Sequence, residues 1–251
     1  MVRKLAWPNS VFKQGSKGFT LAVFGISDLH LSFGTDKPMD VFGPHWQGHA
    51  AKMAANWDAM VGPEDIVLCP GDLSWAMTLD EAQADLSWIG ARPGKKILGR
   101  GNHDYWWSGI GKVRAALPPN CWALQNDAID MGEVVIAGSR LWSGPHALDF
   151  KAQDQKIYDR ELARLELSLK HAQKIADGKT IIASVHYPPF GAKGQPTHFV
   201  PLLHEYGVTL CVYGHLHGHH SHRSASQGQI DGINYKLIAC DYLNFAPIEL
   251  M

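Results

Sequence analysis

Seven short apolar runs, each bounded by glycine, proline or polar residues, constrain this chain more than any other feature of its sequence. Runs of this length with such boundaries are typical of buried strands. They are FTLAVFGIS (19–27), DIVLCPG (65–71), KKILGRG (95–101), VVIAGS (134–139), TIIASV (180–185), TLCVYG (209–214) and YKLIAC (235–240). We therefore expect a core built on strands at these positions.

Helical patterns separate several of these runs. Residues 49–61 are rich in Ala and Met, which favours a helix. Thr78 with Glu81 forms a capping-box pattern, which predicts a second helix near 79–90.

The clearest helical pattern covers residues 153–177 and ends at Gly178, a typical C-terminal cap. Its apolar stripe recurs at alternating steps of four and three, at Tyr158, Leu162, Leu165, Leu169, Ala172 and Ala176. Strands alternating with helices predict an α/β fold. No repeat or Pro/Ser linker divides the chain, so we expect one domain over 1–251.

Polar residues that commonly bind metals follow five of the seven runs. They are Asp28, His30, Asp72, Asn102, His103, Asp104, His186, His215 and His217. The carboxyl ends of strands in an α/β sheet meet at one crevice, so we expect these side chains to converge. A mixture of carboxylate, imidazole and amide suits two borderline divalent cations rather than Ca²⁺.

The spacing of these residues supports a metal site. Asp28-x-His30 and His215-x-His217 each place two donors two residues apart, which points both the same way from extended backbone. A glycine precedes each of Asp72, Asn102 and His215, and it lets the backbone bend closely around a metal pair.

These blocks read D-x-H, G-D, G-N-H-D, H and G-H-x-H in order over 28–217, and in this the chain resembles the calcineurin-like metallophosphoesterase superfamily. The resemblance implies a sandwich of two mixed β-sheets flanked by helices. It also implies one metal on Asp28, His30 and His217, a second on Asn102, His186 and His215, and Asp72 bridging both. His103 matches the histidine that protonates the leaving oxygen or stabilises its charge.

The same resemblance implies a mechanism. Two divalent cations would activate a bridging hydroxide for in-line attack on a phosphate mono- or diester, with no covalent phosphoenzyme. The donor set accepts Mn, Fe, Zn or Co, and Mn is the metal to add first in vitro.

One motif departs from the phosphoprotein phosphatases of this superfamily, which read G-D-x-x-D. Here the block is GDLSW, with Trp75 in place of the second Asp. We therefore expect a bacterial-type phosphohydrolase branch rather than a phosphoprotein phosphatase. The partner that orients His103 stays unassigned, because the adjacent Asp104 need not face the same way.

Substrate contacts carry no motif. Arg100, Arg140 and Tyr105 are candidates, because arginine offers a bidentate fork to phosphate oxygens. Aromatic residues near the ligand blocks could wall a pocket or pack in the core; these are Tyr105, Trp106, Trp107, Trp46, Phe42 and Phe190. The histidines that follow the last block, His219, His220 and His222, are expected in a solvated loop.

The charge balance limits the classes of partner that we expect the chain to bind. The chain carries 23 Lys and Arg against 24 Asp and Glu, with no basic block that would track nucleic acid or an anionic membrane. We expect a small or medium phosphorylated substrate. A nuclease and a non-catalytic scaffold on the same fold are the alternatives, and the oligomeric state stays open.

The compartment follows from two further features. No apolar run is long enough to cross a bilayer, and the basic residues at the N-terminus precede no apolar signal segment. The four cysteines show no paired spacing, so we expect free thiols and a cytoplasmic protein.

Overall fold

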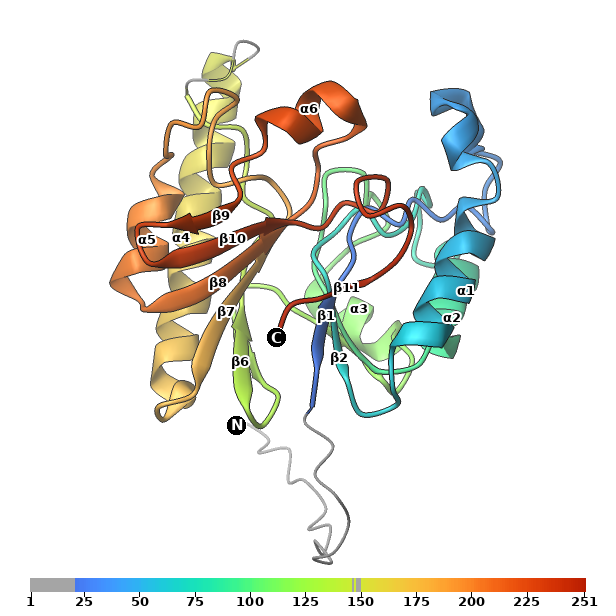
Figure 1. Ribbon diagram of the computed structural model, residues 1–251, viewed down its shortest axis with the longest axis horizontal. Helices are drawn as coiled ribbons and strands as arrows, with labels where there is room; N and C mark the ends of the chain where they lie inside the picture. Colours follow the sequence, from blue (N-terminus) through green and yellow to red (C-terminus); the bar gives the residue numbers. More distant parts are fainter. Residues whose placement is uncertain (1–20, 146, 148–149) are drawn as a thin grey trace, which may run out of the picture.

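Two β-sheets pack face to face in the computed structural model, which describes residues 21–145, 147 and 150–251 (Figure 1). Within these residues one sheet has the strand order β11-β1-β2-β3-β4 and the other the order β5-β6-β7-β8-β10-β9. The first consists of β11 (Ile248–Glu249), β1 (Val23–Gly25), β2 (Ile66–Cys69), β3 (Lys95–Leu98) and β4 (Cys121–Ala123). The second consists of β5 (Ala128–Asp130), β6 (Val134–Ala137), β7 (Thr180–Val185), β8 (Val208–Tyr213), β10 (Ile233–Leu237) and β9 (Gly228–Ile230).

Both sheets are mixed. Strands β1 to β4 are parallel and β11 joins them antiparallel, whereas β6, β7, β8 and β10 are parallel and are flanked by antiparallel β5 and β9. Helices cover the outer face of each sheet (Figure 1). They are α1 (His49–Met60), α2 (Gln83–Ala91) and α3 (Ile110–Ala116) on the first sheet, and α4 (Ala152–Ala176) and α5 (Phe199–Glu205) on the second. The expected sandwich of two mixed sheets flanked by helices is confirmed.

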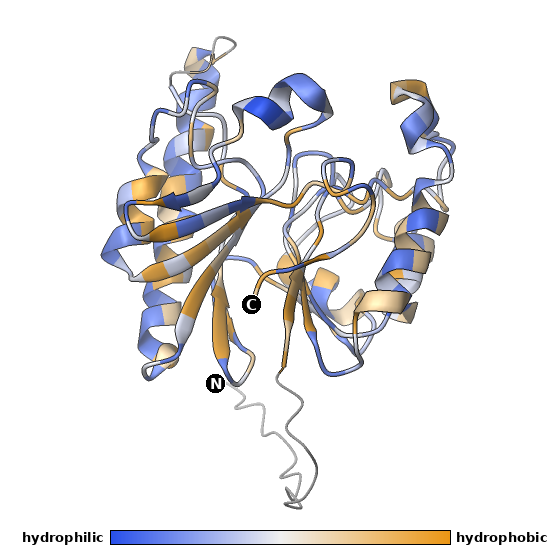
Figure 2. Cartoon of the chain, viewed as in Figure 1, coloured by the Kyte–Doolittle hydropathy of each residue, from blue (hydrophilic) through white to orange (hydrophobic). Residues whose placement is uncertain are grey.

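Alternation along the strands divides the core into three apolar layers. In β2, Ile66 and Leu68 face the opposite sheet, whereas Val67 and Cys69 face the helices. The central strands β1, β2, β6, β7 and β8 are correspondingly mostly apolar, whereas the helices mix hydrophilic and hydrophobic residues (Figure 2). Together the layers hold the two sheets and their helices in one arrangement, and this brings the strand ends of both sheets together.

The seven apolar runs all contain strands, as predicted. Residues 19 and 20 of the first run lie outside the described residues, as do 1–18 of the expected single domain. The sequence did not predict β4, β5, β9 and β11, which have two or three residues each and end or flank the sheets. All four cysteines are buried and free.

The expected helices form with small shifts of their ends. The stripe on α4 packs against the second sheet, and the helix ends at Asp177 and Gly178, which both have positive φ (46° and 84°). Thr78 and Glu81 make both hydrogen bonds of the capping box (3.2 and 3.3 Å), but they lie in a turn and α2 begins only at Gln83. Along the described chain, no helix has the length and apolar character needed to cross a bilayer.

Replacing Leu165 by Ala should test the layer under α4. Leu165 is fully buried, so we expect Leu165→Ala to lower the free energy of unfolding by about 2–5 kcal/mol. Leu167→Ala is the matched control, because Leu167 is 55% exposed on the same helix and should cost less than about 0.5 kcal/mol. Urea denaturation measures both, and equal losses would contradict the packing of this face.

Candidate metal centre

Polar residues at the carboxyl ends of both sheets converge on one place. The first sheet supplies Asp28 and His30 after β1, Asp72 after β2, and Asn102 and His103 after β3. The second sheet supplies His186 after β7, and His215 and His217 after β8. The structure therefore brings together every residue that the sequence analysis assigned to metal binding.

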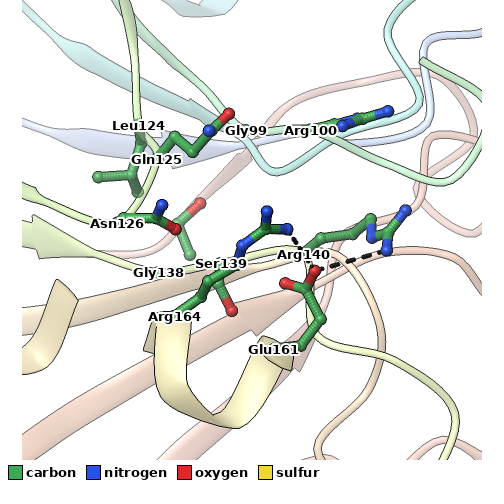
Figure 3. Close-up of a pocket in the computed structure, with 11 residues that line it drawn as sticks. Gly99, Arg100, Leu124, Gln125, Asn126, Gly138, Ser139, Arg140, Glu161 and Arg164 are labelled. Atoms are coloured by element: carbon green, nitrogen blue, oxygen red, sulfur yellow. Dashed lines mark hydrogen bonds and ion pairs between the residues drawn. The ribbon is translucent and has the colours of Figure 1, made fainter. Parts of the chain in front are cut away.

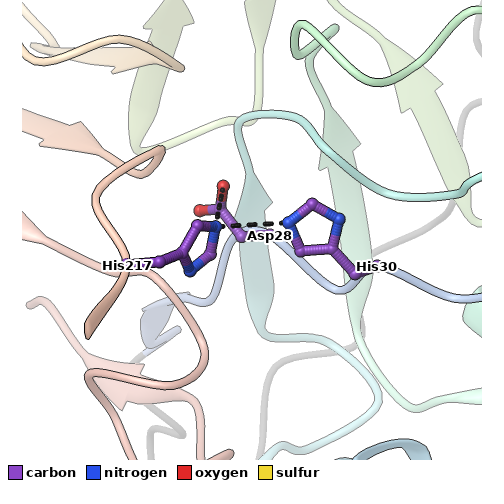
Figure 4. A group of neighbouring side chains, drawn as sticks. All are labelled: Asp28, His30 and His217. Carbon is purple, nitrogen blue, oxygen red and sulfur yellow. Dashed lines mark hydrogen bonds and ion pairs between the residues drawn. The ribbon is translucent and has the colours of Figure 1, made fainter. Parts of the chain in front are cut away.

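A first group consists of Asp28, His30 and His217 (Figure 4). Nε2 of His217 lies 3.2 Å from Nε2 of His30 and 3.5 Å from Oδ1 of Asp28. Two donor atoms that bind one ion at about 2.1 Å in tetrahedral geometry are about 3.4 Å apart. The spacing of this group thus matches the donors of a single cation.

A second group consists of Asp72, His186 and His215, with Asn102 between them. Oδ1 of Asn102 lies 2.8 Å from Nε2 of His186 and 2.9 Å from Nδ1 of His215. Oδ2 of Asp72 lies 3.5 Å from Nε2 of His186. One amide oxygen, one carboxylate and two imidazoles therefore face a common point.

Asp72 faces both groups. The same Oδ2 atom that is 3.5 Å from His186 of the second group is 3.9 Å from Nε2 of His30 in the first. A carboxylate placed in this way is positioned to serve two cations at once.

The electrostatics of the centre favour bound cations. Burial, with repulsion from neighbouring imidazoles, holds the pKa of both His30 and His186 well below the ordinary value, so both are neutral and able to act as ligands. Burial first, and then the charges of Asp28 and Asp104, raise the pKa of Asp72 well above its usual range. A divalent cation would relieve this repulsion, so the donor set fits a metal pair.

Asp241 is part of the centre and was missed by the sequence analysis. Its carboxylate lies 2.9 Å from Nδ1 of His217, accepts a hydrogen bond from the Gly218 amide at 3.1 Å, and lies 3.3 Å from Nε2 of His222. Burial alone would lower the pKa of His217, but hydrogen bonds to Asp241 and Asp28 raise it to about 10. Asp241 follows the seventh apolar run directly, so the strand-end rule applied to that run would have found it.

The backbone of the candidate ligand residues differs from the prediction. Asp28, His30, Asp72 and His215 have φ of 58°, 45°, 50° and 69°, in the left-handed region that non-glycine residues rarely adopt. The expectation that Asp28-x-His30 and His215-x-His217 point the same way from extended backbone is therefore wrong. Their convergence comes from strained turns, which cluster at functional sites because the surrounding structure must hold them in place.

At two positions in the motifs, only glycine avoids a steric clash. A Cβ on Gly101 would overlap the Asp72 carboxylate, and a Cβ on Gly214 would overlap Asp28 and Ser27. The predicted close approach of backbone to the centre is therefore present at both positions.

His103 lies beside the first group. Its backbone amide donates to Oδ1 of Asp72 at 2.8 Å, and its half-buried ring lies 5.8 Å from the ring of His30. Trp75 packs against it with ring centroids 4.4 Å apart and also stacks on His30 at 5.0 Å. Trp75 thus contacts the histidine that an aspartate in its place would orient.

Asp104 does not orient His103. It is buried and accepts hydrogen bonds from the amides of Leu73, Ser74 and Gly101 and from Nε1 of Trp106, at 2.7–3.2 Å. Its carboxylate therefore ties the loop after β3 to the loop after β2. These bonds fix the positions of Asn102 and Asp72 relative to each other.

The sequence left two interpretations of the aromatic residues, a pocket wall or core packing, and the structure divides the residues between them. Trp106, Trp107 and Phe190 are buried in the core, and Phe42 and Tyr105 are 62% and 55% exposed. Only Trp46 in this set both joins the core and contacts the centre, with its ring 6.0 Å from His30 and 5.8 Å from His217.

The structure also places the histidines that follow the last motif block and the two arginines proposed to contact substrate. His219, His220 and His222 lie in the short helix α6 (Gly218–Ser224), so the expected loop is wrong, and His222 contacts Asp241. Arg100 and Arg140 line a small cavity near the centre.

Comparison with known proteins shows the family of this chain. The family model for calcineurin-like phosphoesterases matches residues 21–219. The Gene 66 proteins of Mycobacterium phages L5 and D29 are each 40% identical, over 80 and 83 residues. These matches cover 31% and 33% of this chain but only 37% and 40% of the phage proteins, so the chain spans well under half of those relatives.

Two solved structures have a similar fold. One is a protein of unknown function from Aquifex aeolicus, with a TM-score of 0.51, 17% identity, and coverage of 92% of this chain and 96% of that one. The other is phosphopantetheinyl hydrolase from Mycobacterium tuberculosis, with a TM-score of 0.54, 14% identity, and coverage of 87% and 88%. At these identities the likeness concerns the fold alone.

Removing the Asp241 carboxylate should weaken metal binding. We expect Asp241→Ala to lower Mn²⁺ affinity about 10–100-fold, because a carboxylate behind a metal-binding histidine fixes its orientation and basicity. Isothermal titration calorimetry measures the loss. Asp231→Ala, at an exposed position before β10, is the control and should bind as the unmodified protein does. Equal affinity in all three proteins would show that Asp241 does not support the site.

Proposed function

The chain belongs to the calcineurin-like phosphoesterase family, and on that premise we propose that it is a metal-dependent phosphohydrolase acting on a phosphate mono- or diester. The observation that carries the proposal is the position of Asp72, whose Oδ2 atom lies within 4 Å of histidine nitrogens from both donor groups. A carboxylate shared between two such groups is suited to hold the pair of cations that two-metal hydrolysis uses.

The proposed donors divide between two divalent cations. Asp28, His30 and His217 would hold one, and Asn102, His186 and His215 the other, with Asp72 shared. When bound, such a pair supplies Lewis acidity, which lowers the pKa of a water and neutralises charge on the phosphoryl oxygens. Mn, Fe, Zn and Co all suit these donors.

His103 is the proposed catalytic residue. Burial first, and then the charge of His217, lower its pKa, so the free protein holds it neutral near pH 7. A bound anionic phosphoester would raise that pKa, because a negative charge favours the protonated ring. The ring could then protonate the leaving oxygen or stabilise its charge.

The substrate and the compartment are proposed more broadly. The near-neutral chain favours a small or medium phosphorylated molecule over nucleic acid. Free, buried cysteines suit a reducing compartment, and this supports a proposed cytoplasmic location.

Two substitutions should separate chemistry from metal binding. We expect His103→Ala to keep its metals and lose about 10²–10⁴ in turnover, because only the proton donor is removed. Asp72→Ala should lose both metal and turnover, since it removes the shared ligand. Metal content by mass spectrometry and rates with a chromogenic ester measure the two effects. Full metal content and full rate in Asp72→Ala would refute the bridging role.

The activity itself is tested by adding Mn²⁺ back to metal-stripped protein. The substrates are 4-nitrophenyl phosphate and bis(4-nitrophenyl) phosphate, which differ only in the second ester. We expect metal-restored hydrolysis of at least one, and the preferred ester assigns a monoesterase or a diesterase. Two bound metals without turnover of either ester would count against the proposed activity.

A further inference from the structure

A small cavity lined by three arginines lies beside the metal centre. We call it the arginine pocket, and it is lined by Gly99, Arg100, Leu124, Gln125, Asn126, Gly138, Ser139, Arg140, Glu161, Arg164 and Ser184 (Figure 3). The lining residues come directly after β3, β4 and β6, from the end of β7 and from α4. The pocket therefore shares the carboxyl-end edge of the sheets with the metal centre, on the side of β4 and β6.

Three short connections join the pocket to the centre. Arg100 precedes Asn102 by two residues, and Ser184, near the end of β7, precedes His186 by two residues. The carbonyl of Arg140 accepts the amide of Tyr187, which follows His186, at 2.9 Å. A group in the pocket would thus be a neighbour of a molecule bound at the metals.

The charge of the lining favours an anion. Glu161 accepts bonds from Arg164 at 2.7 Å and Arg140 at 3.5 Å, whereas Arg100 forms no ion pair with a carboxylate in the described part of the chain. Three positive groups and one negative group leave a net charge of about +2. Arg140 and Glu161 are largely buried, with side chains 14% and 1% exposed, so water screens this charge poorly.

Unpaired polar atoms point to a ligand. Nε of Arg100, Nε of Arg140 and Oγ of Ser184 are buried donors without a hydrogen-bond partner in the structure. Ser184 is only 3% exposed. Buried donors are nearly always satisfied, so three at one cavity require an explanation. Oε2 of Glu161 also lacks a partner, and a ligand with a hydroxyl beside its oxyanion would satisfy it.

We infer that the arginine pocket is a second anion-binding site, which takes a compact oxyanion such as a phosphoryl or carboxylate group. The cavity measures about 20 Å³, so it admits one or two oxygen atoms of such a group rather than a ring. The anion is either free or the second acidic group of a substrate whose phosphoester lies at the metals. The assignment of the anion to a substrate group rests on the proposed function, whereas the existence of the anion site does not.

The first experiment titrates inorganic phosphate into the metal-stripped full chain at constant ionic strength, followed by calorimetry. Without metals the arginines are the receptor under test, so binding should weaken about tenfold in Arg164→Gln, which loses a charged donor. Arg160→Gln is the matched control, because Arg160 is exposed on the same helix and lies outside the lining. Ser184→Ala, which removes an unpaired donor without a charge change, should also weaken binding, and it serves if Arg164→Gln does not fold.

Either of two results would overturn the inference. One is no phosphate binding by the unmodified chain, which would mean that water alone fills the pocket. The other is equal affinity in Arg164→Gln, Ser184→Ala and Arg160→Gln, which would place the phosphate elsewhere.

A second experiment distinguishes the two sources of the anion in the metal-loaded protein. It compares kcat/KM for two 4-nitrophenyl phosphodiesters, one with a carboxylate-terminated alkyl arm and one with the matching uncharged arm. If the pocket receives a substrate group, Arg164→Gln should lower the ratio of the two values about tenfold and Arg160→Gln should not. An unchanged ratio with weakened phosphate binding supports the site and assigns it to a free anion. No turnover by the unmodified protein would refute the proposed function and leave the phosphate titration standing.

Discussion

Two buried carboxylates, Asp28 and Asp72, set the constraint on which the rest of the site depends. Both lie where the two sheets meet, at most 1% exposed, and among the described residues no lysine or arginine pairs with either. Burying a charge without a partner is costly, so such carboxylates need a compensating cation. Burial holds His30 and His186 neutral, and protonated His217 supplies only one positive charge, so a metal pair is the natural counter-charge for both carboxylates.

The same carboxylates hold the loops in place. Asp28 accepts the amide of His215 from the other sheet at 3.0 Å, and Asp72 accepts the amide of His103 at 2.8 Å. Backbone bonds from Asp28 to Gly71 and from His30 to Asp72, both 3.0 Å, join the loops after β1 and β2. These bonds offset the cost of the left-handed turns, so the donors keep their positions before any ligand arrives.

Around this centre the structure uses packing and charge for different tasks. Trp75 contacts His103 and His30 through its ring, where an aspartate would have used a hydrogen bond. Asp241 acts from behind His217, and Asp104 ties two loops together without touching the His103 ring. The arginine pocket then adds positive charge on the side of β4 and β6, which would favour one orientation of an elongated anionic substrate.

The sequence by itself determined the central strands, the long helix α4 and the set of residues that converge. The short apolar runs and the stripe from Tyr158 to Ala176 are local signals, and parallel strands align their ends whatever their order. Only the tertiary structure decided the rest. Short edge strands such as β4 and β11 form because neighbouring strands offer hydrogen-bonding partners, and the helix α6 was hidden by turn-like composition. The left-handed ligand turns, the pairing of Asp241 with His217 and the gathering of Arg100, Arg140 and Arg164 all depend on contacts between residues far apart in the chain, which no local pattern records.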